Sequence, residues 1–197
     1  MNSMNHALIG TVVYEYIKGK YGIELDKESF IKGNTCPDHS LAFLRPHRLR
    51  FCGKAVRKKT VRLCRTAQGE ISARDSKKIG ILCHYYCDFL CRPHNPRFGW
   101  NLKKHVRYED ELLDCMKSHL NEFLNTDYII APSIPFGPVE INRRMNYLVH
   151  ERPVLWGDYE EELLRAVEAC AQLVLWVSGV ILMLDGVPLL PPVSLPA

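Results

Sequence analysis

Apolar residues recur three and four positions apart along most of the chain, the spacing that gathers side chains on one face of an α-helix. Six segments follow this spacing and are predicted to be helices: 5–18, 26–32, 54–64, 75–93, 102–124 and 158–184. No segment is predicted to be a strand. The pattern therefore favours an all-α fold, a helical bundle.

Capping residues and helix breakers set the predicted boundaries. Asp26 is the expected N-cap of the second helix and Gly33 its expected end, while Asp75 or Ser76 is expected to cap the fourth helix. Gly157 or Asp158 begins the last helix. Proline and glycine predict loops over residues 92–101 and 131–138.

The C-terminal helix contains the most apolar stretch of the chain. Ala169–Leu184 holds sixteen uncharged residues, short of the roughly 20 that a membrane-spanning helix needs. Charged residues flank this stretch on both sides. We therefore expect 158–184 to be a core helix and expect no transmembrane span; contact with a membrane surface is the alternative.

Length and composition indicate one globular domain over residues 1–197. The hydrophobic fraction is 47% and the charged fraction 24%, values typical of a folded protein rather than of a disordered one. No internal repeat and no low-complexity linker divides the chain. The sequence predicts no particular oligomeric state.

Positive charge is concentrated in one segment, 45–78. Nine Lys or Arg occur between Arg45 and Arg65, without a single Asp or Glu. Such a segment favours an anionic partner, either a membrane surface or nucleic acid, and the alternative is a merely solvated helix face.

The eight cysteines bear on the location of the protein. The N-terminal residues show neither the basic start nor the cleavage site of a signal peptide, so we expect reduced thiols and a cytoplasmic protein, peripheral to a membrane if the basic segment binds one. Cys83, Cys87 and Cys91 recur every fourth residue. Zinc binding by these thiolates is one interpretation, and core packing is the favoured one.

Metal-ligating side chains form a pattern on two predicted helices. His84 and Asp88, and likewise His105 and Glu109, are four residues apart, so each pair shares a helix face about 5–6 Å apart. His94 lies in the loop between them. Imidazole and carboxylate are both zinc ligands, so a shared metal site is predicted.

The same pattern continues upstream, and the whole of it resembles a known family. The motifs are His6-Ala-Leu-Ile, Gly33-Asn-Thr-Cys-Pro-Asp38, His84-Tyr-Tyr-Cys-Asp88, His94, and His105-x3-Glu109. They resemble the zinc-dependent phospholipase C family of bacterial phosphatidylcholine-cleaving enzymes and clostridial alpha-toxin-like proteins, over about residues 5–109. The resemblance implies an all-helical fold, shared with the single-strand-specific zinc nucleases, that holds two or three zinc ions.

The resemblance also implies which residues bind each ion. The first zinc would be held by Asp38, His47, His84 and Asp88, with His39 as the competitor of His47. The second would be held by His94, His105 and Glu109. The third would be held by His6, with Asp88 bridging from the first.

One departure from the family concerns the third zinc. Secreted members supply a mature N-terminal Trp whose amine and carbonyl bind this ion, and no Trp occurs near the start of this chain. Met1 or Met4 would substitute for it, or the third site would be weak or empty.

The resemblance implies a phosphodiester hydrolase that uses metal-activated water. Asp38 or Glu109 would accept the proton of that water, and the family favours Asp38. A phospholipid headgroup ester is the expected substrate. The alternatives are a zinc phosphodiesterase acting on single-stranded nucleic acid, and a zinc-binding protein that has lost catalysis.

Overall fold

The structure, a computed structural model, describes residues 1–39, 46–67, 69–99, 101–151 and 158–183. Its α-helices are α1 (Ser3–Tyr21), α2 (Lys27–Thr35), α3 (Leu49–Thr66), α4 (Ala73–Leu90), α5 (Leu102–Ser118), α6 (Leu120–Asn125), α7 (Pro138–Glu151) and α8 (Tyr159–Ile181). Two short 3-10 helices, η2 (Arg92–His94) and η3 (Pro96–Phe98), follow α4. The described residues contain no strand, which confirms the predicted all-α fold class.

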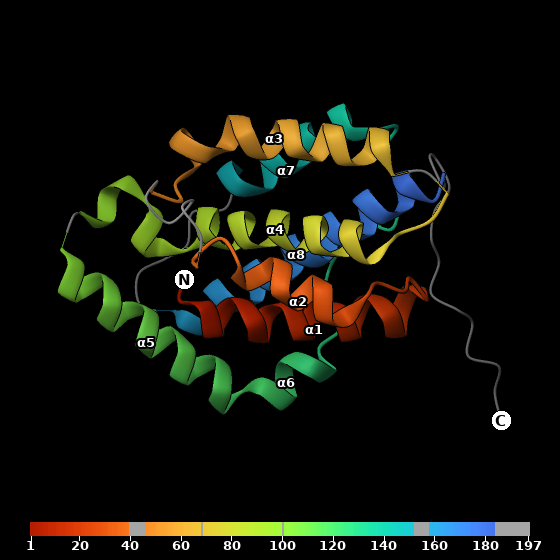
Figure 1. Cartoon of the computed structure of the whole chain (residues 1–197). Coiled ribbons are helices and arrows are strands. Elements are labelled where there is room, and N and C mark those ends of the chain that lie inside the picture. The colour runs from red at the N-terminus through yellow and green to blue at the C-terminus, as the bar shows by residue number, and fades with distance from the viewer. Residues whose placement is uncertain (40–45, 68, 100, 152–157, 184–197) are drawn as a thin grey trace, which may run out of the picture.

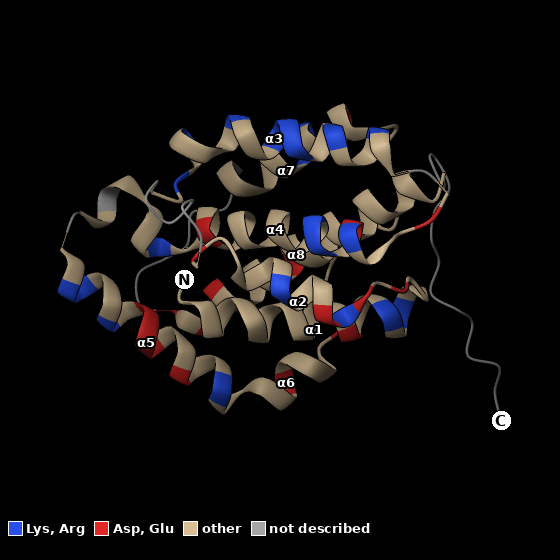
Figure 2. Ribbon diagram, viewed as in Figure 1, with Lys and Arg blue, Asp and Glu red and all other residues tan. Residues whose placement is uncertain are grey.

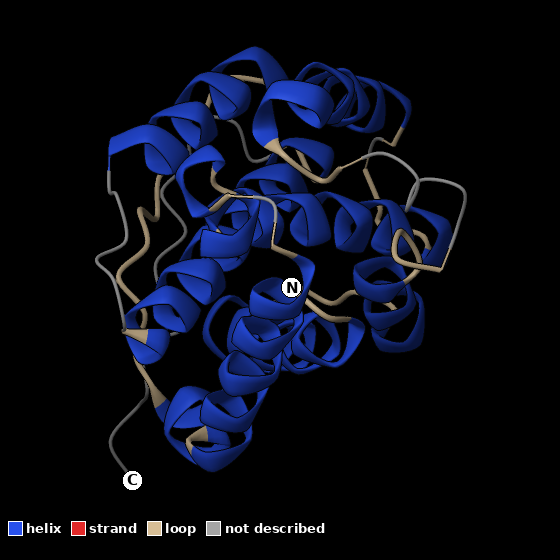
Figure 3. Ribbon diagram, turned by 90° about the vertical axis from the view of Figure 1, so that its left-hand side faces the viewer, coloured by secondary structure: helices blue, strands red, loops and turns tan. Residues whose placement is uncertain are grey.

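The apolar helix α8 lies at the centre of the bundle and contacts α1, α4, α5 and α7 (Figure 1). α3 packs beside α7 on one side of this core, and α6 packs against α1 on the other. Seen from the end where the chain begins, the helices surround the N-terminus (Figure 3). The bundle thus brings the start of α1 next to the ends of several other helices.

The length and composition of α8 alone would allow it to cross a membrane, but 78% of its most apolar window is buried inside the structure. Asp158 caps it by accepting a hydrogen bond from the Glu161 amide. The burial is that of a core helix, as expected; Gly157, the alternative start, and Leu184, the expected end, lie outside the described residues.

The helices α2 and α4 cross with their backbones in direct contact at two glycines. A Cβ atom built on Gly80 would lie 2.2 Å from the carbonyl oxygen of Phe30, and one built on Gly33 would lie 2.2 Å from that of Lys77. No side chain fits at either position, so glycine is required there by the close approach. Gly33 therefore lies inside α2 and is not its end, contrary to the prediction.

Two other predictions about helix boundaries were wrong, and one helix was missed. Ser72, and neither Asp75 nor Ser76, is the N-cap of α4, and its hydroxyl accepts a hydrogen bond from the Asp75 amide. The segment 102–124 is not one helix, because the chain turns at His119 and a short α6 follows. The helix α7 was not predicted.

Candidate metal centre

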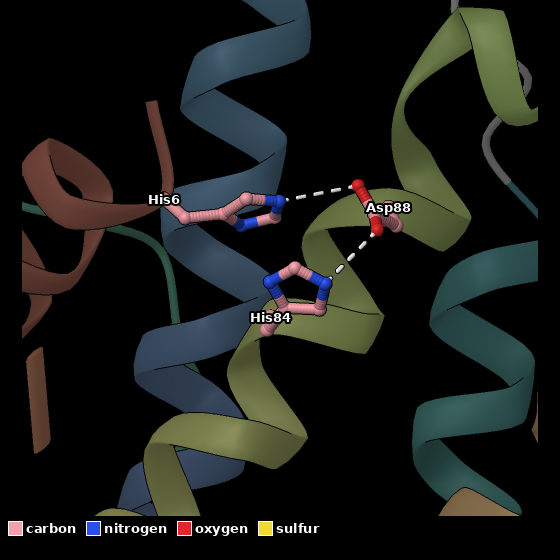
Figure 4. A group of neighbouring side chains, drawn as sticks. All are labelled: His6, His84 and Asp88. Carbon is pink, nitrogen blue, oxygen red and sulfur yellow. Dashed lines mark ion pairs between the residues drawn. The ribbon is translucent and has the colours of Figure 1, made fainter. Parts of the chain in front are cut away.

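Side chains from separate segments meet at the end of the bundle where the chain begins. α4 carries His84 and Asp88 one turn apart, both fully buried, and α1 brings the buried His6 against them. Figure 4 shows these three side chains pointing toward one another, with the His6 Nε2 3.3 Å from Asp88 Oδ1 and the His84 Nε2 3.3 Å from Asp88 Oδ2. The helical spacing of four residues thus produces the predicted shared face.

The first group of ligand atoms comprises Asp38, His47, His84 and Asp88. His47 Nδ1 lies 3.0 Å from both His84 Nε2 and Asp88 Oδ2. The Oδ1 atom of Asp38 lies 3.8 Å from His47 Nδ1 and 3.6 Å from His84 Nε2. Four atoms held 2.0–2.2 Å from a tetrahedral zinc lie about 3.3–3.6 Å apart. The separations of 3.0–3.8 Å are close to these values, and Asp38 and Asp88 each lie near the same two imidazoles.

The second group comprises His94, His105 and Glu109. The Oε1 atom of Glu109 lies 2.8 Å from the His105 Nε2 and 3.5 Å from the His94 Nε2. Unlike the first group, these side chains are only partly buried, with 29% of the His105 side chain exposed. Three ligands and a solvent-facing side are typical of a catalytic zinc site, which keeps a coordination position for water or substrate.

The third group comprises His6 and Asp88, and Asp88 connects it to the other two. The Asp88 Oδ1 atom faces His6, lies 3.6 Å from the His94 Nε2 and accepts a 2.6 Å hydrogen bond from the amino group of Met1. That amino group is also 3.0 Å from Glu109 Oε1. The two oxygens of one carboxylate are thus turned toward two different groups.

Backbone carbonyls fix the orientation of two imidazole rings. His84 Nδ1 donates to the carbonyl of Asn34 at 2.8 Å, and His94 Nδ1 donates to that of His47 at 3.0 Å. Because a carbonyl oxygen only accepts, each ring carries its proton on Nδ1 and turns the lone pair of Nε2 toward the carboxylates. The Asn34 carbonyl reaches His84 because the two glycines let α2 lie against α4.

The ionisation states suit metal binding. Burial and the neighbouring His84 lower the pKa of His6 to about 3, so its ring is neutral at neutral pH. Burial alone would raise the pKa of Asp88, but His94, the Met1 amine and His6 hold that pKa well below its usual range. The Met1 amine and His105 likewise hold the pKa of Glu109 low against the effect of burial. Charged carboxylates and neutral imidazole are the forms that bind zinc.

A comparison with protein families gives a match to the family described as zinc dependent phospholipase C, over residues 5–153. The chain belongs to this family. No curated protein and no solved structure matches the chain. The match extends well beyond Glu109, where the resemblance seen in the sequence ended. Family membership implies zinc, and supports a phospholipase C-like phosphodiesterase at the level of the family.

The residues present fit the zinc that the family implies. The donor set is imidazole and carboxylate, and His6 is fully buried with no hydrogen-bond partner for either ring nitrogen. A buried imidazole without a hydrogen bond is unfavourable unless a cation completes its surroundings. Three candidate metal-holding groups occur in the described part of the chain, namely His6, His84 and Asp88; Asp38, His47 and His84; and His94, His105 and Glu109.

All eight side chains predicted as zinc ligands of this family meet in the structure, and their role as ligands remains a prediction. His47 rather than His39 faces the first group, because the His39 ring instead lies 3.0 Å from the Ser3 hydroxyl at the exposed edge. The amino group that reaches the third group is that of Met1, whereas Met4 is 54% exposed.

The cysteines lie on the core side of α4. The Cys87 and Cys170 sulfurs are 3.3 Å apart and Cys170 donates to the Cys83 carbonyl. The interaction with Cys170, together with burial, raises the pKa of the Cys87 thiol, and the interaction with Cys83, together with burial, raises that of Cys170. None of the three metal-holding groups found among the described residues includes a cysteine. These contacts are those of core packing, the favoured interpretation.

Sequence reasoning missed a buried carboxylate behind the second group. Glu162 of α8 accepts hydrogen bonds from the Tyr108 hydroxyl at 2.9 Å and from the Arg92 amide at 3.3 Å, and its side chain is fully buried. Tyr108 precedes Glu109 in α5, and Arg92 begins the 3-10 helix that ends at His94. Glu162 thereby ties together the two segments that carry this group. Its position in the first turn of a helix gave no signal, since acidic residues are common there.

Proposed function

We propose that the chain is a zinc-dependent hydrolase that cleaves the headgroup ester of a phospholipid, releasing an alcohol and a phosphomonoester. The observation that supports this most is the contrast between the mostly buried ligand atoms around His84 and the partly exposed group of His94, His105 and Glu109, with Asp88 Oδ1 lying 3.6 Å from His94 Nε2 between them. Bound zinc would neutralise phosphate oxygens and lower the pKa of water.

Within this proposal the first ion is held by Asp38, His47, His84 and Asp88, and the second by His94, His105 and Glu109. His6 and the Oδ1 atom of Asp88 hold the third. The buried His84 and Asp88 exclude water, and the Asn34 carbonyl orients the His84 ring so that its Nε2 faces the ligand cluster. The substrate phosphate approaches the exposed side of His105 and Glu109.

Asp38 accepts the proton of the attacking water in this proposal. One of its oxygens faces the His47 and His84 pair, and the other accepts a 2.9 Å hydrogen bond from the Ser3 hydroxyl, which orients the carboxylate. Its side chain is 17% exposed, compared with 1% for Asp88, so water reaches it. Glu109 is the alternative base, although its Oε1 atom already contacts two imidazoles.

The test is zinc analysis of the purified protein together with hydrolysis of a chromogenic phosphodiester, a short-chain phosphatidylcholine and a single-stranded oligonucleotide. His84→Ala should lower both zinc content and hydrolysis. His150→Ala, at an exposed histidine on α7, should change neither. A zinc-free wild-type protein, or activity indifferent to His84→Ala, would refute the proposal. Cleavage of the oligonucleotide alone would replace the lipid with nucleic acid as substrate.

Asp38→Asn and Glu109→Gln distinguish the two candidate bases. If Asp38 is the base, Asp38→Asn lowers kcat at saturating zinc by more than the loss of zinc content explains. If Glu109→Gln alone produces this result, the roles are exchanged.

A further inference from the structure

A second feature is a groove of about 610 Å³ between the C-terminal half of α3 and the first turns of α4. Four basic residues line it, together with polar and aliphatic side chains: Lys59, Arg62, Arg74 and Lys78. Arg74 precedes His84 by ten residues on one helix, which is about 15 Å at 1.5 Å per residue. The basic end of the groove therefore lies apart from the metal centre, whereas Ile81 and Leu82, at its other end, precede His84 by three and two residues.

The positive charge of this face is not neutralised. α3 buries Cys52, Val56, Thr60 and Leu63, so its lysines and arginines all lie on the outer side (Figure 2). Six of them form no ion pair with any described carboxylate: Lys54, Arg57, Lys58, Lys59, Arg62 and Arg65. Within the groove, Asp75 pairs with Lys78 alone, at 2.7 Å. The surface is thus a concentrated, unpaired cationic face.

The surroundings of the groove favour lipid over nucleic acid. Surfaces that bind single strands combine cations with aromatic side chains on which bases stack. Neither this groove nor the one of about 460 Å³ on the other flank of α3 is lined by an aromatic residue, and the exposed Phe51 at the start of α3 lies outside both, with the Arg50 guanidinium over its ring. Exposed apolar residues lie nearby instead. Val139 is 71% exposed and shares a face of α7 with Asn142, which donates to the Arg57 carbonyl. Phe136, 80% exposed, lies two residues before the start of α7.

We propose that this face docks the protein onto an anionic phospholipid bilayer, with one lipid phosphate seated among Lys59, Arg62 and Arg74 and the outer side of α3 lying along the headgroups. Cations beside exposed apolar side chains are the combination that binds membrane surfaces. The proposal concerns binding and does not depend on hydrolysis. It goes beyond the proposed function by assigning a lipid-binding surface to α3, apart from the ligands that α5 carries.

The experiment is sedimentation of the full chain with vesicles of phosphatidylcholine, with and without about a third of phosphatidylserine, at rising salt. The wild type should bind only the anionic vesicles, and binding should weaken with ionic strength. Each basic residue near an anionic surface strengthens binding about fivefold, so a triple Lys59→Gln, Arg62→Gln, Arg74→Gln variant should bind roughly 100-fold more weakly.

The control removes the same net charge from exposed positions on α1 and α2 that line neither groove, through Lys18→Gln, Lys27→Gln and Lys32→Gln. It should bind nearly as the wild type does. Both variants should keep the wild-type melting temperature and the wild-type hydrolysis of a soluble phosphodiester. Equal loss in the two triple variants, equal binding to uncharged vesicles, or binding to a single-stranded oligonucleotide in place of vesicles would each overturn the proposal. Vesicle binding by a protein that hydrolyses nothing would leave it standing and refute the proposed function alone.

Discussion

Replacement of Gly80 by alanine tests the helix crossing that positions the metal centre. The added Cβ would lie 2.2 Å from the Phe30 carbonyl oxygen and 3.0 Å from both the Asn34 amide nitrogen and the Gly33 Cα. Ordinary contact begins near 3.4 Å, so α2 and α4 must separate by about 1 Å. All three neighbouring atoms belong to the backbone, and no rotamer change relieves the overlap.

The expected loss of stability follows from two opposing terms. Alanine in a helix interior is favoured over glycine by about 1 kcal/mol. Overpacking destabilises a protein by about 1–3 kcal/mol. Because the added Cβ would clash with backbone atoms that cannot change rotamer, we expect a cost at or above the upper end of this range. We therefore expect a net destabilisation of about 2 kcal/mol, which lowers Tm by about 4–8 °C in a chain of this size.

The same separation should weaken the centre itself. It pulls the Asn34 carbonyl away from His84 Nδ1, now 2.8 Å distant, and loss of such an outer contact lowers metal affinity about 10–100-fold. Urea denaturation and competition with a chromogenic zinc chelator measure the two effects. Gly19→Ala is the control, because this exposed glycine of α1 has no atom within 4 Å of the added Cβ, and the variant should gain up to about 1 kcal/mol. If the Gly80→Ala protein had the same free energy of unfolding and the same zinc affinity as the Gly19→Ala control, the reasoning would be refuted.

Three further predictions concern the centre and its support. Asp88→Asn should lower the zinc content by more than His105→Ala does, because Asp88 faces two groups; equal losses by metal analysis would contradict this. Glu162→Gln leaves the buried Arg92 without its carboxylate and should destabilise the protein by about 3 kcal/mol in urea, and an unchanged midpoint would exclude this role. Zinc at 100 times its Kd adds about 2.7 kcal/mol, so removal by a chelator should lower Tm by about 5–10 °C, reversibly on readdition.

The ligand pairs of α4 and α5 could be predicted from the sequence because they depend only on the helical period. His84 with Asp88 and His105 with Glu109 share a face in any α-helix, whatever surrounds it. His6 and Asp38 are different, since no local rule relates residues so distant along the chain. Only the resemblance to a known family placed them in the same centre.

Other features depend on packing that local patterns do not express. Gly33 resembles a helix end in sequence, and its partner Gly80 gives no sign of a contact between two backbones. The chain changes direction at His119, and this change brings the Phe123 side chain into the core. The apolar spacing in the sequence continues across His119 without a break, so it gives no sign of the turn. The helix α7 carries apolar residues at helical spacing. The predicted loop 131–138 ends at Pro138, whereas the structure has Pro138 as the first residue of a helix, a position where proline is favoured.

The sharing of Asp88 has a consequence for how the protein responds to scarce metal. The Oδ1 atom of this buried carboxylate accepts a hydrogen bond from the Met1 amino group at 2.6 Å, and its Oδ2 atom lies 3.0 Å from His47 Nδ1, so a cation bound at one oxygen leaves the other already directed at the second group. The first cation also fixes the plane of the carboxylate for the second. We therefore expect limiting zinc to divide the population into unloaded and multiply loaded molecules, rather than to distribute single ions evenly among them.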